Sequence, residues 1–201
     1  MKKILPVLLI SFLLITGCAH KVVFMHENVA KITKVAVLPF ANETNDLDGS
    51  AVFRKLFFDG LCRKGYIVLP LDQVDKKLNE LGITQGGQLN SISQEELMKE
   101  LDAPALVYGT LNKCAYVTAA IYRKKEVAGT VKIYYKGELF WEDTRQIKED
   151  EVMKGNILKN LGDQLVDKIV DKAIAGALKI HPLQPQFERM TNILLISVPG
   201  K

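Results

Sequence analysis

The chain has 201 residues, a formal net charge of +4 and 48% hydrophobic residues. That length is enough for one domain with a substantial core. The near balance of charge, with no basic run longer than residues 123–125, excludes the electrostatic footprint of a nucleic-acid-binding protein.

The amino-terminal segment predicts a secretory signal peptide. A positively charged start precedes an apolar run, Ile4–Ile15, which is shorter than the roughly 20 residues of a membrane-spanning helix. The run leads into "ITGC", residues 15–18, which resembles the bacterial lipobox. The resemblance implies cleavage between Gly17 and Cys18, a diacylglycerol thioether on Cys18, and acylation of the new amino terminus. The alternative is an ordinary signal peptide followed by a chance cysteine.

The residues around the cysteine also predict where the protein is held. Two or more acyl chains anchor a protein stably, whereas one holds it only marginally. Ala19 stands where aspartate would retain a lipoprotein at the inner membrane, so the resemblance implies the outer membrane, with the domain facing the periplasm. Residues 1–17 are expected to be removed, and residues 18–33 to form the lipidated cysteine and a tether that reaches at most about 50 Å.

The first half of the expected domain, residues 34–181, predicts alternating strands and helices. Near-continuous apolar runs are typical of strands buried on both faces. Asp48 and Asp72 are expected to cap two of the helices, Ser93 and Glu96 to form a capping box, and residues 84–91 to be a flexible loop. Strands are predicted over 34–40, 66–70 and 105–111, and helices over 49–64, from Asp72 to Gly82, and through Leu101.

The second half predicts antiparallel strands and a long helix. A tight turn is expected at Lys136-Gly137 and a hairpin tip at residues 123–125. The whole indicates an α/β (α+β) fold with a mixed sheet in a three-layer-like arrangement. Strands are predicted over 116–123, 127–135 and 138–147, and a sheet-covering helix over 155–180. The tail, residues 182–201, holds the apolar run Asn192–Val198, which could be an edge strand, a partner-docking segment, or a segment packed on its own domain.

The sequence holds no recognisable catalytic or metal-binding motif. Two of its three histidines lie in the tether, and the third, His181, follows the long helix. Cys62 and Cys114 are expected at opposite ends of the sheet, too far apart for a disulfide. We therefore expect no enzyme activity, no metal and no cofactor other than the lipid.

One loop is well placed for a ligand or a partner. In open α/β sheets, ligands favour the loops beyond the carboxyl ends of parallel strands. The loop after the first strand offers hydrogen-bonding groups at Asn42, Thr44, Asn45 and Asp46. The alternative is a loop of ordinary turn residues.

Four stretches carry a family resemblance: "KVAVLPFANET", "LCRKGYIVLPLDQV", "LDAPALVYGTL" and "KGELFWED". They are similar to the α/β domain shared by the TolB amino-terminal module, the curli-secretion lipoprotein and the lipoproteins that activate penicillin-binding proteins. Over most of residues 15–183 the chain resembles a family of small bacterial lipoproteins that includes a neisserial surface-antigen candidate. The resemblance implies a TolB-like fold and a non-enzymatic role beside an envelope transport, secretion or assembly system. It implies envelope proteins as partners, with self-association open; the alternative is a small-ligand carrier or sensor.

Overall fold

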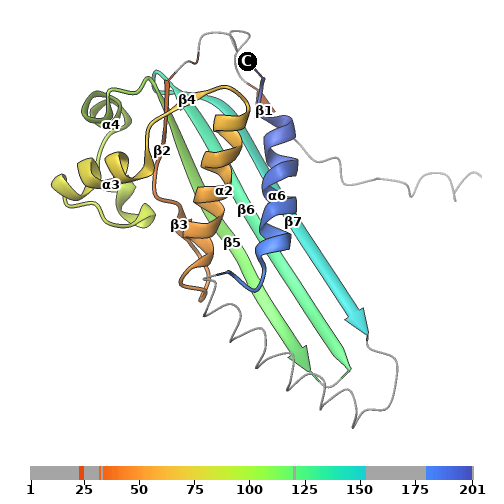
Figure 1. Cartoon of the computed structure of the whole chain (residues 1–201). Coiled ribbons are helices and arrows are strands. Elements are labelled where there is room, and N and C mark those ends of the chain that lie inside the picture. The colour runs from red at the N-terminus through yellow and green to blue at the C-terminus, as the bar shows by residue number, and fades with distance from the viewer. Residues whose placement is uncertain (1–22, 25–31, 33, 120, 153–179, 201) are drawn as a thin grey trace, which may run out of the picture.

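The computed structural model describes residues 23–24, 32, 34–119, 121–152 and 180–200 (Figure 1). Strands and helices alternate first, and a meander of long strands follows, as the sequence predicts. The predicted helix over residues 155–180 lies almost wholly outside the described residues. The elements are β1 Val23–Phe24, β2 Lys34–Val37, β3 Ala41–Asn42, α2 Gly49–Arg63, β4 Ile67–Val68, α3 Leu71–Glu80, the 3-10 helix η3 Gly86–Ser91, α4 Gln94–Leu101, β5 Ala105–Ala119, β6 Tyr122–Tyr135, β7 Glu138–Val152 and α6 Gln184–Ser197.

One mixed sheet of seven strands organises these elements. The strand order is β1-β7-β6-β5-β2-β4, and the short β3 also pairs with β5. Strand β2 is parallel to β4 and β5, whereas β5, β6 and β7 form an antiparallel meander. The predicted mixed α/β fold, with crossovers first and antiparallel strands after, is confirmed.

The two faces of the sheet are covered by different helices. Because side chains alternate along a strand, Val35 and Val37 of β2 face one layer and Ala36 and Leu38 face the other. The first layer holds the larger core, built with α2 and α6, which lie side by side (Figure 1). The second layer packs under α3, η3 and α4. None of the described helices has both the length and the apolar character needed to cross a bilayer.

The carboxy-terminal segment is a helix, so the edge-strand interpretation of Asn192–Val198 is wrong. Phe187, Met190 and Leu194 of α6 are fully buried in the larger core, which confirms packing on the chain's own domain. The residues that the sequence set apart as a tail thus contribute to that core. Polar contacts with β7 support the same placement: Ser197 Oγ donates to Asp143 Oδ2 at 2.6 Å, and Gln186 Nε2 donates to Glu149 Oε2 at 2.7 Å.

The meander strands are longer than the sequence predicts. Strands β5 and β7 have 15 residues each and β6 has 14, against about 5–6 in a typical strand. The predicted strand 116–123 is divided between the end of β5 and the start of β6, and residues 123–125 lie within β6, not at a hairpin tip. The pairing register between β5 and β6 shifts at a bulge between Leu111 and Lys113, and the pairing continues beyond it. Strand β5 therefore extends past Leu111, where we predicted its end. The turn at Lys136-Gly137 is confirmed, with positive φ at both residues.

The helix starts differ partly from prediction. Ser93 caps α4, its Oγ accepting the Glu96 N–H at 3.1 Å, as predicted. Asp48 and Asp72 make no side-chain cap, because Asp48 itself has helical backbone angles and Pro70 occupies the cap position of α3. The predicted flexible loop contains η3, where the side chains of Gln85 and Gln88 satisfy backbone N–H groups reciprocally.

The predicted tether is interrupted by a strand. Val23 and Phe24 form β1, which pairs antiparallel with Glu142 and Trp141 of β7. Chain pairing therefore begins well before residue 34, the predicted start of the domain. The stretch between Cys18 and the sheet is correspondingly shorter than predicted.

Candidate functional site

The loop predicted for a ligand or partner follows β3 and is closed by its own hydrogen bonds. Asn42 Oδ1 accepts from the backbone N–H of Thr44 at 3.0 Å and from its hydroxyl at 2.8 Å. Asn42 Nδ2 donates to the Asp46 carbonyl at 2.6 Å, and Thr44 Oγ1 accepts the Asp46 N–H at 3.2 Å. Asn45 is exposed. Most of the polar groups that we expected to offer a ligand are therefore bonded to one another.

Asp46 connects this loop to the start of α2. Its Oδ1 accepts the backbone N–H groups of Gly49 at 2.6 Å and of Asp48 at 3.1 Å. These N–H groups belong to the helix start, which has no helical partner for them. Asp46 therefore supplies the acceptor that the sequence assigned to Asp48.

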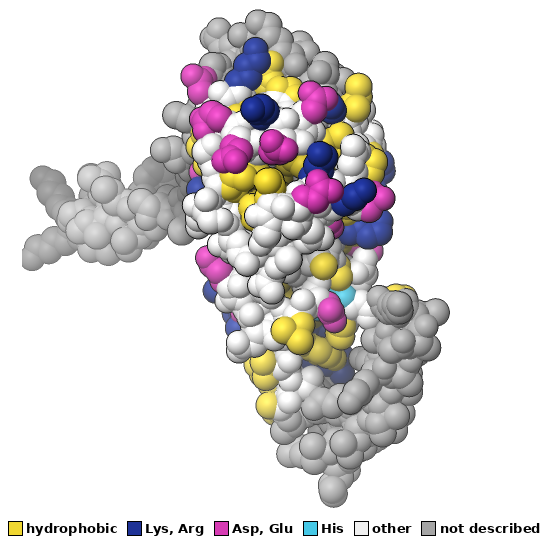
Figure 2. All heavy atoms as spheres, turned by 90° about the vertical axis from the view of Figure 1, so that its left-hand side faces the viewer, with side chains coloured by type: hydrophobic (Ala, Val, Ile, Leu, Met, Phe, Trp, Pro, Cys, Tyr) yellow, Lys and Arg dark blue, Asp and Glu magenta, His cyan; other side chains and the backbone are white. Residues whose placement is uncertain are grey.

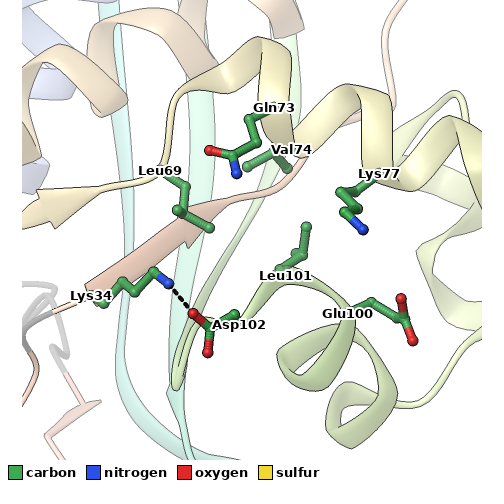
Figure 3. A pocket seen from close by; sticks show the side chains of 8 residues that line it. All are labelled: Lys34, Leu69, Gln73, Val74, Lys77, Glu100, Leu101 and Asp102. Carbon is green, nitrogen blue, oxygen red and sulfur yellow. Dashed lines mark hydrogen bonds and ion pairs between the residues drawn. The ribbon is translucent and has the colours of Figure 1, made fainter.

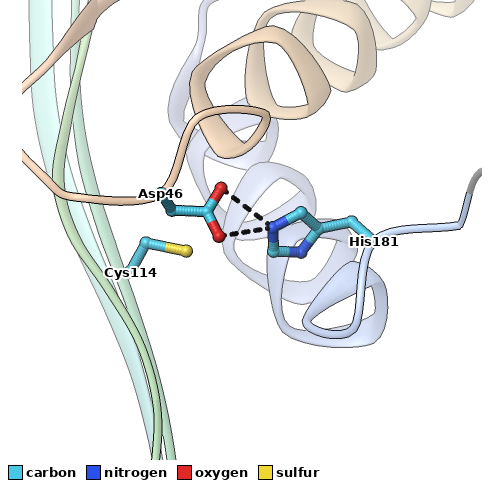
Figure 4. Close-up of side chains that lie close together, drawn as sticks. All are labelled: Asp46, Cys114 and His181. Atoms are coloured by element: carbon cyan, nitrogen blue, oxygen red, sulfur yellow. Dashed lines mark hydrogen bonds and ion pairs between the residues drawn. The ribbon is translucent and has the colours of Figure 1, made fainter. Parts of the chain in front are cut away.

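His181 completes the contact from the other end of the chain (Figure 4). Its Nε2 lies 3.1 Å from each carboxylate oxygen of Asp46, and its Nδ1 accepts the Leu183 N–H at 3.0 Å. Since Nδ1 is an acceptor, the proton of a neutral imidazole lies on Nε2 and is donated to Asp46. The buried ring also packs edge-on against Phe187, with centroids 5.1 Å apart.

The ionisation of Asp46 follows from these contacts. Burial opposes the charged form, but the Gly49 N–H and the His181 side chain outweigh it, so the pKa of the Asp46 carboxyl lies below its usual range. A carboxylate here accepts hydrogen bonds from α2 and from the segment that precedes α6. We name the group of Asp46, His181 and Cys114 the Asp46 cluster.

Cys114 of β5 is the third member of the cluster. Burial, together with the charge and hydrogen bond of Asp46, raises the pKa of the Cys114 thiol to about 12. A nucleophilic cysteine needs a lowered pKa and a neighbouring base. Here the carboxylate lies between the thiol and the imidazole (Figure 4), so the order of groups is not that of a Cys-His-Asp triad. The arrangement holds Cys114 as a neutral thiol.

The same residues are the group of possible metal ligands among those described, with ligand atoms all within 4.8 Å of one another. A metal-bound histidine usually donates its second ring N–H to an acceptor. In this structure the second nitrogen, Nδ1 of His181, faces a donor, the Leu183 N–H. The hydrogen bonds of the imidazole ring fit a structural contact between the starts of α2 and α6 better than a metal centre.

Sequence reasoning found one member of this cluster and missed two. Asp46 belongs to the predicted loop, whereas Cys114 was expected just beyond a strand and His181 outside the sheet altogether. The signal for Asp46 and Cys114 was available, because Asp46 follows β3 and Cys114 lies in β5 just beyond its parallel pairing with β3. His181 could not be placed, since its position depends on the path of the chain after β7. Cys62, at the end of α2, and Cys114 are both free thiols, as the predicted separation requires.

A cavity of about 250 Å³ lies elsewhere, between α3 and α4 (Figure 3). Lys34 begins β2, so this cavity is at the amino end of the parallel strands, opposite to the loops favoured by the sequence. Lys34 and Asp102 form an ion pair at its edge, and this hydrogen bond lowers the pKa of Asp102. The lining is Lys34, Leu69, Gln73, Val74, Lys77, Glu100, Leu101 and Asp102. Acidic and basic side chains are interspersed over this side of the molecule (Figure 2). The surface around the cavity is therefore neither predominantly acidic nor predominantly basic.

Comparison with known proteins settles the family. The family model described as "Putative lipoprotein GNA1162-like" matches residues 26–186. The chain belongs to this family. The match confirms the resemblance to small bacterial lipoproteins. No curated protein sequence matches the chain.

Three solved structures match the chain at low sequence identity. The lipoprotein GNA1162 from Neisseria meningitidis is 20% identical, with a TM-score of 0.55, and the match covers 69% of this chain and 99% of that one. The PelC dodecamer from Paraburkholderia phytofirmans gives 14% identity, a TM-score of 0.44 and coverage of 68% and 84%. The LpoB carboxy-terminal domain from Escherichia coli is 13% identical, with a TM-score of 0.41, and the match covers 60% of this chain and 93% of that one. The likeness to GNA1162 shows a common fold.

Proposed function

We propose that the protein is a non-enzymatic lipoprotein, anchored through Cys18 to the periplasmic face of the outer membrane, and that its domain acts by binding other envelope proteins. The observation that carries the proposal is membership of a lipoprotein family together with the lipobox-like residues 15–18. Ala19, which follows the cysteine, supports the outer membrane as the destination.

The anchor is tested by Cys18→Ser in cells that express the full chain. The lipidated protein is expected in the membrane fraction and labelled by a palmitate analogue, whereas the variant loses the label and moves to the soluble or inner-membrane fraction. Cys62→Ser, which changes an exposed cysteine, is the matched control and should change neither property. A Cys18→Ser protein that stays lipid-labelled would refute the anchor.

The bonding of the Asp46 cluster supports a non-enzymatic role. Its thiol has a raised pKa, its carboxylate is engaged by two backbone N–H groups, and its imidazole is held between two partners. Each group thus has a structural partner. The small-ligand alternative gains no support from the predicted loop, because Asn42 and Thr44 bond to each other.

The protein-binding role is tested by crosslinking in cells. Three large apolar side chains are exposed at the far end of the meander, where β5 and β7 end. The exposed fractions are 46% for Val117, 39% for Ile121 and 61% for Val152. A photoreactive residue at Val117 or Ile121 is expected to give an adduct heavier than the monomer. An adduct of twice the monomer mass would identify self-association, and any other mass an envelope partner. A protein that stays monomeric at every exposed position, after gentle extraction, would contradict the role.

A further inference from the structure

The distance between Cys18 and the folded sheet is short. Residues 19–22 alone separate the cysteine from β1, whose Val23 pairs with Glu142 of β7. Whatever its conformation, the chain from Cys18 to Val23 spans at most about 18 Å. A lipid anchor on Cys18 therefore keeps the β1 edge of the sheet within about that distance of the membrane.

Several chain segments meet at this edge. Ser197, at the end of α6, donates to Asp143, the neighbour of Glu142 along β7. Lys64, just after α2, donates from Nζ to the Leu195 carbonyl at 2.9 Å, and the Tyr66 hydroxyl donates to the Pro199 carbonyl at 2.6 Å. Figure 1 shows β1 beside this end of α6. We name the surface formed by the ends of α2 and α6 and by β1 the anchor-side end.

The anchor-side end exposes apolar side chains. Ile196 of α6 is 81% exposed and Ile193, one turn before it, is 37% exposed. Arg63, at the end of α2, adds an exposed basic group to the same end. Apolar side chains flanked by basic groups are the composition of helix surfaces that enter the headgroup region of a bilayer.

We propose that the anchor-side end rests on the phospholipid surface that holds Cys18, with Ile193 and Ile196 in the headgroup region. This inference rests on the lipid anchor of the proposed function. The short stretch 19–22 is what selects lipid over another occupant, because it leaves little room for a protein between this end and the membrane. The start of α2, whose 15 residues span about 22 Å, then points away from the bilayer.

The placement is tested with tryptophan variants of the lipidated full-length mature protein. Ile196→Trp and Leu47→Trp both change exposed residues, and Leu47, 89% exposed, lies before the start of α2 at the far end of that helix. Each protein is reconstituted in vesicles of phosphatidylethanolamine and phosphatidylglycerol that carry a nitroxide near the lipid glycerol. The natural Trp141 is fully buried and gives the same background in both. We expect the tryptophan at 196 to be quenched at least about twofold more than the tryptophan at 47.

The possible outcomes separate the placement from the anchor. Ile193→Trp gives a second probe on the same helix and should also be quenched more than Leu47→Trp. Equal quenching of all three variants, in protein that floats with the vesicles, would overturn the placement and leave the anchor intact. Protein that carries no lipid and does not float would overturn the anchor and the placement together.

Discussion

The carboxylate of Asp46 and the imidazole of His181, 135 residues apart in sequence, are joined by hydrogen bonds of 3.1 Å. Asp46 also accepts the backbone N–H groups at the start of α2, and His181 accepts the N–H of Leu183 at the start of α6. The pair therefore fastens the beginnings of the two helices that cover the larger core. This contact complements the hydrophobic packing between α2 and α6.

Replacing Asp46 should destabilise the fold. Asp46→Ala removes the acceptor of two backbone N–H groups and of His181, which we expect to lower the free energy of unfolding by about 1–3 kcal/mol. Urea denaturation at pH 7 measures the change. Asn45→Ala, at the exposed neighbouring position, is the control and should stay within about 0.5 kcal/mol of the natural protein. Equal effects of the two substitutions would show that the Asp46 contacts contribute nothing.

The contribution of Asp46 should disappear in acid. Its folded-state pKa is lowered, whereas an unfolded chain has an Asp pKa of about 3.9. A carboxyl group whose pKa is lower in the folded state stabilises the fold fully when the pH is above its unfolded-state pKa. This contribution is lost as the pH falls through its folded-state pKa. The difference in unfolding free energy between the natural protein and Asp46→Asn should therefore shrink as the pH falls from about 5 toward 2.

Comparison with Asp46→Asn isolates this effect from other acidic groups. Asp102 and Asp150 also have lowered pKa values, through hydrogen bonds from Lys34 and Lys148 respectively, and they titrate in both proteins alike. Stability measured by urea titration at each pH gives the difference directly. A difference that keeps its size down to pH 2 would mean that the charge of Asp46 is not what stabilises the fold.

The close approach of α2 and α6 depends on Gly60. A Cβ at this position would lie 2.0 Å from Leu195 Cδ1, so Gly60→Ala forces the two helices apart or Leu195 into another rotamer. We expect Gly60→Ala to lower the free energy of unfolding by about 1–3 kcal/mol. Gly87→Ala is the matched control, because a Cβ there would meet nothing within 4 Å. If Gly87→Ala unfolds at a lower temperature than Gly60→Ala, then α2 and α6 can accommodate a Cβ at position 60.

The two free thiols should differ in reactivity. Since burial and Asp46 raise the pKa of Cys114 to about 12, little thiolate exists at pH 8. Burial and Asp59 also raise the pKa of Cys62, but this residue is exposed. Iodoacetamide should modify Cys62 at least about tenfold faster than Cys114, as peptide mass spectrometry can measure. Cys62→Ser should leave only the slow site. Fast modification of Cys114 would instead reveal an activated nucleophile and contradict the non-enzymatic role.

Local pattern was enough to predict most of the fold. Apolar runs predicted the buried strands β2 and β5, and Ser93 with Glu96 predicted the start of α4 correctly. The carboxy-terminal helix was not predicted, because the apolar run Asn192–Val198 is too short to show a helical period by itself. The helical period becomes visible only over a longer window, in which Phe187, Met190, Leu194 and Val198 recur at spacings of three and four.

The site was less predictable than the fold. Loop composition drew attention to residues 42–46, but it could not show that these side chains bond to one another. Cys114 and His181 meet Asp46 only through tertiary structure, with the chain beyond β7 intervening. The end of β5 was predicted too early for a similar reason, since the bulge near Asn112 leaves no clear mark in the alternation of residues.

The length of the meander has a consequence for where this protein can act. From Glu142, beside β1, to Val152 at its end, β7 runs about 33 Å. A hydrogen-bonded three-stranded ribbon is far stiffer than a linker. If Cys18 carries the proposed lipid anchor, this span would fix the height above the membrane at which the far end of the meander could meet a partner. Adding two residues to each strand would raise that height by about 7 Å and preserve every inward-facing side chain, whereas adding one would turn the faces over.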